Sequence, residues 1–135
     1  MINGQLLKAN LESSFENAII SCCLNNFSPE HFFIFQDINR AFNQIRSFGS
    51  SSIELSFVIQ GICSAHFDFR QRLTAENFLA AALILAEAGG RLTDLYDNPI
   101  SNIPDLSVGY SILASHLASE HGKFLNLLWG KTRLN

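Results

Sequence analysis

The stretch "TAENFLAAALILAEAGGRLTD", positions 74–94, constrains the fold of this chain more than any other part of the sequence. Thr74 can cap a helix there, and residues 78–88 are apolar except for Glu87. A helix that is apolar on nearly all sides is usually buried on most of them. A Gly-Gly pair at 89–90 then ends the helix, and the "RLTDL" that follows has the composition of a strand. We therefore expect a buried helix that leads directly into a strand.

The remaining sequence alternates between strand-like and helix-like segments. A short strand with a polar turn is expected near the start, and Ser28 followed by Pro29 marks the first turn of a helix. Apolar residues at helical spacing extend that helix to about Arg46, and Gly61 stops the next one. This alternation predicts an α/β domain in which a mixed β-sheet is layered with helices. The expected segments are strands at 18–24, 62–69, 91–95 and 109–115, and helices within 28–46, 49–61, 74–88 and 117–129.

Composition bounds the size and the surface of the molecule. The 135 residues suit one domain, residues 1–135, and leave no room for a second. Apolar residues make up 47% of the chain and charged residues only 16%, against about 25% charged in an average soluble chain. With twelve Phe and nine Lys plus Arg, we expect a second copy of the chain or a protein partner to cover part of the apolar surface. The alternative is a monomer with an unusually large apolar core.

Charge and hydropathy argue against two classes of partner. The net charge is −3 and the basic residues are scattered, whereas a nucleic-acid site needs Lys and Arg gathered on one face. Glu76 and Glu87 bracket the longest apolar run, which leaves it too short to span a membrane. The polar start does not resemble a signal segment. We therefore expect no nucleic acid, no membrane and a cytoplasmic location.

The cysteines indicate a reducing environment. Cys22, Cys23 and Cys63 are odd in number, and the first two are adjacent, which is a poor geometry for a disulfide between them. We expect all three to be reduced and buried. The sequence has no Cys-x-x-Cys and no His-Glu-x-x-His motif, so a zinc site is not expected.

Three segments in order carry a likeness to a known family: "RSFGSSSIELSFVIQG", "FDFRQRLTAENFLAAALILAEAGGRLTDL" and "GYSILASHLASEHGKFLNLL". Over residues 46–129 they resemble the C-terminal half of the inositol monophosphatase family, which includes the archaeal-type fructose-1,6-bisphosphatases. The segment "NGQLLKANLESSFENAIIS" looks more loosely like the part just upstream. The resemblance implies the α/β fold of that half. For complete members it implies hydrolysis of phosphate monoesters with magnesium.

The same resemblance implies that metal ligands are missing. The chain lacks the Asp-Pro-x-Asp-Gly-Thr-like motif of the family. The Asp that family members place after a Trp, at the start of the Ala-rich helix, corresponds to Asn77, and Glu76 stands in place of the Trp. An amide keeps an acceptor oxygen without a negative charge, and Glu76 points about 100° away around the helix. We expect no catalytic residue and no metal; magnesium would require a partner chain that completes the site.

The resemblance also implies residues on the substrate side of the family's active site. Gly49 and Ser50 match a turn whose backbone approaches the substrate. Asp68 matches an acid that accepts hydrogen bonds from sugar hydroxyls, and Arg70 resembles the Asp-x-Arg version of archaeal-type members. The residues alone leave simpler interpretations open: a helix start with a capping Ser, and a solvated ion pair of Asp68 with Arg70 or Arg72.

Two histidines lie near the start of the last helix. His121 matches a His often found there in the family, but for His116 and His121 capping and packing are the expected roles. The chain has many Ser residues, yet nothing resembles a nucleophile elbow, so a Ser-His-Asp triad is not expected.

Three functions remain open from the sequence. The first is a non-catalytic, phosphatase-derived domain that acts by association with itself or with another protein. The second is an enzyme: one half of a split magnesium-dependent sugar or inositol phosphate phosphatase, or a different hydrolase that uses Asp68 and Glu76. The third is a module that binds a sugar phosphate through Gly49, Ser50, Asp68 and Arg70. The chain can also be a fragment of a longer product.

Overall fold

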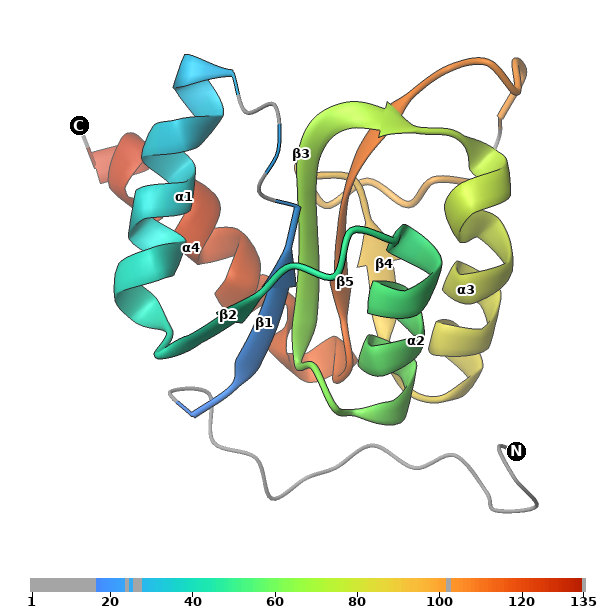
Figure 1. Ribbon diagram of the computed structural model, residues 1–135. Coiled ribbons are helices and arrows are strands. Elements are labelled where there is room, and N and C mark those ends of the chain that lie inside the picture. Colours follow the sequence, from blue (N-terminus) through green and yellow to red (C-terminus); the bar gives the residue numbers. More distant parts are fainter. Residues whose placement is uncertain (1–16, 24, 26–27, 102, 135) are drawn as a thin grey trace.

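A computed structural model describes residues 17–23, 25, 28–101 and 103–134 of the chain (Figure 1). The short strand expected near the start lies outside these residues. Every other expected strand and helix is present, and one strand is added between the first two helices. The elements are β1 (Ile19–Cys22), α1 (Pro29–Ala41), β2 (Gln44–Arg46), α2 (Ser51–Gln60), β3 (Ala65–Leu73), α3 (Ala75–Glu87), β4 (Arg91–Thr93), β5 (Tyr110–Ser115), the 3-10 turn η1 (Ala118–Glu120) and α4 (His121–Leu134).

The strands form one five-stranded mixed sheet in the order β2-β1-β3-β5-β4. β1 lies parallel to β2 and to β3, whereas β5 lies antiparallel to β3 and to β4. The α/β class with a mixed sheet, expected from the sequence, is therefore confirmed.

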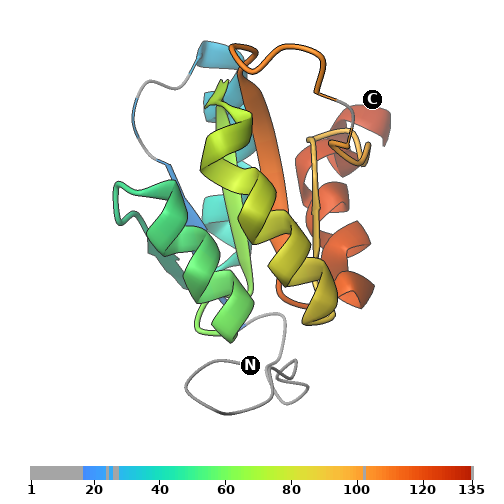
Figure 2. The ribbon, with the colours of Figure 1, turned by 90° about the vertical axis from the view of Figure 1, so that its right-hand side faces the viewer.

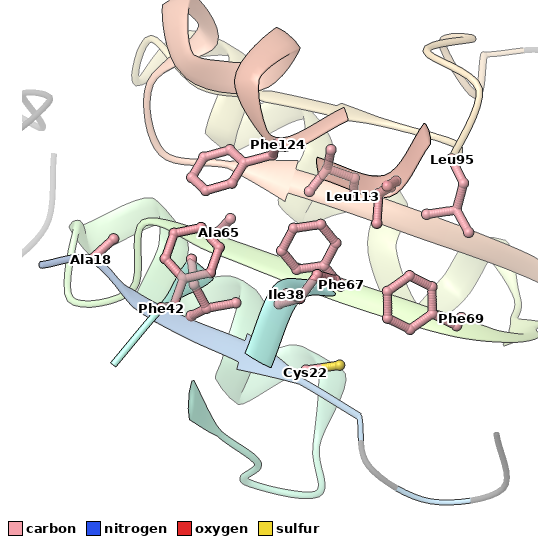
Figure 3. Close-up of a cluster of buried hydrophobic side chains, with 12 residues drawn as sticks. Ala18, Cys22, Ile38, Phe42, Ala65, Phe67, Phe69, Leu95, Leu113 and Phe124 are labelled. Carbon is pink, nitrogen blue, oxygen red and sulfur yellow. The ribbon is translucent and has the colours of Figure 1, made fainter. Parts of the chain in front are cut away.

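Helices cover both faces of the sheet. α1 and α4 lie on one face, and α2 and α3 lie side by side on the other (Figures 1 and 2). Because successive strand residues point to opposite faces, Ala65, Phe67 and Phe69 of β3 join the core beneath α1 and α4 (Figure 3). His66 and Asp68 point the other way, toward α2 and α3. Polar side chains are thus buried on one face only of this strand.

The first helix is shorter than the sequence predicted. It ends at Ala41 rather than near Arg46, and Phe42 already has extended backbone angles. Gln44–Arg46 instead forms an edge strand in register with Ile19–Ser21 of β1. Phe42 keeps its place in the core, against Phe124 of α4. The spacing of the apolar residues did not distinguish a helix that continues to Arg46 from a helix that ends at Ala41 and is followed by a strand. The strand forms because pairing with β1 supplies backbone hydrogen bonds that the sequence alone does not show.

The expectation that α3 is buried on most sides is wrong. Only Ala75, Phe78 and Leu85 of this helix are buried. Leu79, Leu83 and Ile84 are exposed, Leu83 by 66%. The reason is the layer order, since α3 packs on the sheet and on α2 but nothing in the described chain covers its outer side (Figure 2).

Glycines follow both α2 and α3, and the two glycines after α3 have separate roles. Gly61 follows α2 with φ 80°, a left-handed conformation that favours glycine. Gly89 follows α3 with φ 96°. Gly90 has no positive φ, but a Cβ there would lie 2.5 Å from the carbonyl oxygen of Ser115. The first glycine of the pair therefore allows the turn, and the second allows β4 to approach β5.

Candidate functional site

The buried side chain of Glu54 fixes the turn before α2. Gly49 has φ 76°, and Ser50 occupies the N-cap position of α2 without a side-chain cap hydrogen bond. The backbone N–H of Phe48 donates to Oε1 of Glu54 at 2.8 Å, and Glu54 is buried. The matched turn at Gly49–Ser50 is therefore fixed by a carboxylate on the sheet side of α2, and the Ser50 hydroxyl is not used as the cap.

Asp68 and Arg70 form a close pair on β3. The Nη2 atom of Arg70 donates to Oδ2 of Asp68 at 2.8 Å, and Nε donates to Oδ1 at 3.2 Å. The backbone N–H of Arg70 also donates to Oδ1, at 2.9 Å. This pairing, together with the charge of Asp68, raises the pKa of Arg70.

The expectation of a solvated ion pair is wrong for the acid. The Asp68 side chain has no exposure at all, while the Arg70 side chain is 21% exposed. The sheet register shifts between Asp68 and Leu73, and Gln71 there has φ 57°, so the strand bends just after the pair. Asp68 thus points inward and Arg70 presents the only partly exposed group of the pair. Arg72 forms no hydrogen bond or ion pair with Asp68.

Three further polar groups lie buried beside this pair. Nδ1 of His66 lies 2.6 Å from Oγ of Ser21 and 3.4 Å from Oε2 of Glu54. Burial raises the pKa of Glu54, with the charge of Asp68 adding to the effect. Burial lowers the pKa of His66 to about 4, so the imidazole is neutral near pH 7. Nε2 of His66 has no hydrogen-bond partner.

Glu54 and His66 were missed in the sequence, although a signal existed. Glu54 lies on the same helix face as Val58, four residues on, and both are buried. His66 lies between Ala65 and Phe67 in a strand that is buried from Ala65 to Phe69. The signal for Glu54 and His66 is a single acid among the apolar residues of one helix, followed by a single His among the apolar residues of the next strand.

Asn77, which the sequence resemblance matched to a metal ligand of the family, lies at the start of α3 and bonds to its N-cap residue. Its Oδ1 accepts hydrogen bonds from the backbone N–H of Thr74 at 3.1 Å and from the Thr74 hydroxyl at 3.0 Å. The same hydroxyl lies 3.2 Å from Oε1 of Glu76. Thr74 therefore starts the helix, as expected, and Asn77 reaches back to it in the manner of a capping box.

The residues present do not by themselves fit a magnesium site. In the part of the chain that the structure describes, no three His, Cys, Asp or Glu side chains lie together in a group that could hold a metal ion. Asp68 directs both oxygens to Arg70, and the amide oxygen of Asn77 is used by Thr74.

The two late histidines serve packing. Nδ1 of His116 lies 2.8 Å from the carbonyl oxygen of Val58, and its ring packs against Gly61. His121 lies between Ser115 and Thr93, with Nδ1 and Nε2 at 2.7 and 2.8 Å from their hydroxyls. Burial lowers the pKa of His121 to about 4. These contacts bind β4, β5 and the last helix to one another.

The three cysteines are free and buried, as expected. Burial raises the pKa of Cys22 far above its usual value, and that of Cys63 to about 11. Thiols held in the neutral form are poor nucleophiles and poor metal ligands.

A mixed sheet with two helices on each face defines an α/β domain, and this one carries a glycine turn before one helix and an Asp-x-Arg pair on the adjacent strand. The model of the inositol monophosphatase family matches residues 1–133. The chain belongs to the inositol monophosphatase family.

Known proteins give the same assignment. A protein of Methanothermobacter thermautotrophicus described as fructose-1,6-bisphosphatase/inositol-1-monophosphatase is 30% identical over 91 residues, which cover 67% of this chain and 32% of that protein. The crystal structure of inositol monophosphatase II from Staphylococcus aureus matches with a TM-score of 0.79 and 26% identity, over 96% of this chain and 47% of that one. The Thermotoga maritima inositol monophosphatase matches in fold, with a TM-score of 0.73 and 17% identity, over 98% and 48%.

The chain spans about half the length of these solved structures and about a third of the curated relative. Among the described residues, no helix is long and apolar enough to cross a membrane.

Proposed function

We propose that this chain is a non-catalytic domain of the inositol monophosphatase family that acts through association with a protein partner or with a second copy of itself. The observation that carries the proposal is the role of Asn77, whose amide oxygen is committed to the start of α3. A neutral amide in a helix cap cannot supply the charge that a pair of divalent ions requires. Magnesium therefore enters only if a partner chain brings the remaining ligands.

Support for association comes from the surface. Large apolar side chains are exposed on both helix layers, among them Phe33 on α1, and Leu79, Leu83 and Ile84 on α3. Large apolar side chains that are exposed together on one helix, as Leu79, Leu83 and Ile84 are on α3, mark interaction sites. The free cysteines further support a cytoplasmic location, where thiols stay reduced.

The test of non-catalysis is hydrolysis of inositol monophosphate and fructose 1,6-bisphosphate by the purified chain in the presence of magnesium. We expect no turnover above a boiled control, for the wild type and for Asn77→Asp, because one added acid does not complete a two-metal site. Magnesium-dependent turnover that Asp68→Ala abolishes would overturn the proposal. Light scattering on the same sample measures the mass of the species assayed.

A second candidate is a site for a sugar or inositol phosphate at Gly49, Ser50, Asp68 and Arg70. One observation favours it: Asp68 orients the partly exposed guanidinium of Arg70, a group suited to phosphate. One of the solved relatives, 26% identical, is described as bound to inositol monophosphate. Calorimetry with millimolar inositol monophosphate tests it, and a heat of binding that Arg70→Ala and Asp68→Ala both remove would favour it over association alone.

A further inference from the structure

A pocket lies between α4 and the loop that follows β4, two segments that lie side by side (Figure 2). This α4 pocket encloses about 440 Å³, within the range of about 300–1,000 Å³ that small-molecule sites occupy. α4 covers one face of the sheet, whereas Asp68 points to the other face. The α4 pocket is therefore separate from the candidate phosphate site. Its lining consists of Leu95, Tyr96, Asp97, Gly122, Leu125, Asn126 and Trp129.

One end of the α4 pocket is aromatic. The ring of Tyr96 stacks on the ring of Trp129, with centroids 5.2 Å apart and planes inclined by 13°. Nε1 of Trp129 donates to the carbonyl oxygen of Leu95 at 2.6 Å, which fixes the indole. The Tyr96 residue is 71% exposed. Two nearly parallel rings, one of them fixed, form a flat apolar surface on which the apolar face of another ring can pack.

The other end of the pocket is polar. Oδ1 of Asp97 lies 3.0 Å from Nη2 of Arg91 and 4.0 Å from Nε2 of His121. The Asp97 side chain is 54% exposed, so its carboxylate can accept further hydrogen bonds. Asn126, exposed on α4, adds an amide that can both donate and accept. These groups match a ligand that carries several hydroxyl groups.

The charges at the polar end limit the class of ligand. Arg91 neutralises the carboxylate of Asp97, so a cationic ligand would meet no net negative charge. Asp97 lines the pocket and Arg91 does not. A phosphate or carboxylate ligand would therefore lie beside a charge of its own sign, which opposes binding. A neutral ligand fits this arrangement best.

We propose that the α4 pocket binds a neutral sugar. The apolar face of the sugar ring packs on Tyr96 and Trp129, and its hydroxyl groups bond to Asp97 and Asn126. Along α4 the pocket extends from Gly122 to Trp129, a length of about 10 Å at the rise of an α-helix. This site is additional to the candidate phosphate site and does not depend on the proposed association.

Gly122 keeps the pocket open and offers a way to close it. A Cβ at this position would have nothing within 4 Å. A larger side chain therefore fits the fold and extends into the pocket. Because Leu has a higher helix propensity than Gly, Gly122→Leu should fill the site without unfolding α4.

The test uses Trp129, which is the only Trp of the chain, so that tryptophan fluorescence reports on the α4 pocket directly. The full chain is titrated with glucose. We expect a saturable change in fluorescence, with half-saturation on the order of 1–10 mM as for a small neutral ligand. Gly122→Leu should weaken binding at least tenfold. The matched control is Lys123→Leu, which places the same side chain one residue further along, outside the lining of the pocket, and should bind as the wild type does.

Calorimetry with glucose gives a second measurement that does not depend on the indole. Tyr96→Ala removes half of the aromatic surface, so we expect its heat of binding to be largely lost. Phe33→Ala on α1 is the matched control, because Phe33 is 69% exposed and Tyr96 is 71% exposed. It should bind glucose as the wild type does.

Glucose 6-phosphate and choline separate the classes of ligand. Each should change the fluorescence of Trp129 less than glucose does at the same concentration. Tighter binding of either charged compound in this assay overturns the inference. So does the absence of a saturable change up to about 100 mM glucose, or equal binding by Gly122→Leu and the wild type.

Discussion

At the scale of single residues, the two partners of the Asp68–Arg70 ion pair differ in their exposure to solvent. The acid is fully buried, whereas the guanidinium reaches solvent. Removal of either partner therefore has a different consequence, since only Arg70 can turn toward water.

We expect Arg70→Ala to lower the free energy of unfolding by about 3–5 kcal/mol, because it leaves a buried carboxylate without its counter-ion. Asp68→Asn keeps an acceptor of the same shape, and the freed guanidinium can be solvated, so we expect a loss of about 1–3 kcal/mol. Urea unfolding of both variants at pH 7 measures the difference. A larger loss of stability for Asp68→Asn than for Arg70→Ala would contradict the finding that Asp68 is the more buried partner.

His66 predicts a pH dependence of stability. Its pKa is about 6.5 when unfolded and about 4 in the folded chain. Between these values the unfolded chain binds more protons, so the free energy of unfolding falls as pH falls from 6.5 to 4, by up to about 1.4 kcal/mol per pH unit. His121 adds a loss of the same sign, and Glu54, with its raised pKa, opposes both above its ordinary value of 4.5.

The variant His66→Asn isolates this contribution, because an amide can face Ser21 and Glu54 without titrating in this range. We expect its stability to change less steeply than that of the wild type between pH 6.5 and 4, by urea unfolding at four pH values. Identical slopes in the two proteins would show that His66 keeps its ordinary pKa when folded.

The sequence singles out candidate residues for this site but does not show their surroundings. Gly49, Asp68 and Asn77 were predicted from the family resemblance, which depends on short segments of local sequence. The inward orientation of Asp68 and the buried contact of Glu54 with Phe48 depend on how α2 lies on the sheet. Such contacts join segments that only the tertiary structure brings together.

At the scale of elements, the end of α3 offers a test of two adjacent glycines. Gly89 has φ 96° with open space around it, so Gly89→Ala should cost about 1–2 kcal/mol of backbone strain. A Cβ at Gly90 would meet the carbonyl of Ser115 and the side chain of Leu85, so Gly90→Ala should cost ~3 kcal/mol by overpacking. Chemical unfolding of both variants gives the comparison, and equal losses would contradict the close approach of β4 to β5.

Element boundaries followed the sequence wherever a local signal marked them. Pro29, Gly61 and the Gly-Gly pair each lie where a helix starts or ends in the structure. The two errors came from partners: β1 draws Gln44–Arg46 into the sheet, and the outer side of α3 has no layer over it in the described chain. Periodicity reports which side of an element is apolar and leaves open what covers that side.

At the scale of the whole molecule, the low share of charged residues predicts how the isolated chain behaves. We expect the folded chain to bind a hydrophobic dye such as ANS, because apolar side chains are exposed along α3. The double variant Leu79→Glu/Leu83→Glu should lose most of the dye fluorescence without loss of the folded circular dichroism spectrum. Phe33→Glu, on the opposite layer, should lose less, and an equal loss would show that the dye does not report on α3.

The strand order has a consequence for how the chain folds during synthesis. β4 is made before β5, yet β5 lies between β3 and β4, and β4 bonds to no other strand of the described sheet. While the ribosome has yet to release Tyr110–Ser115, Arg91–Thr93 has no neighbour to join, and the apolar edge of β3 stays open to other nascent chains. Completion of the sheet must therefore wait until after translation of β5, and the edge of β3 that β5 later covers stays unpaired during the interval between the two strands.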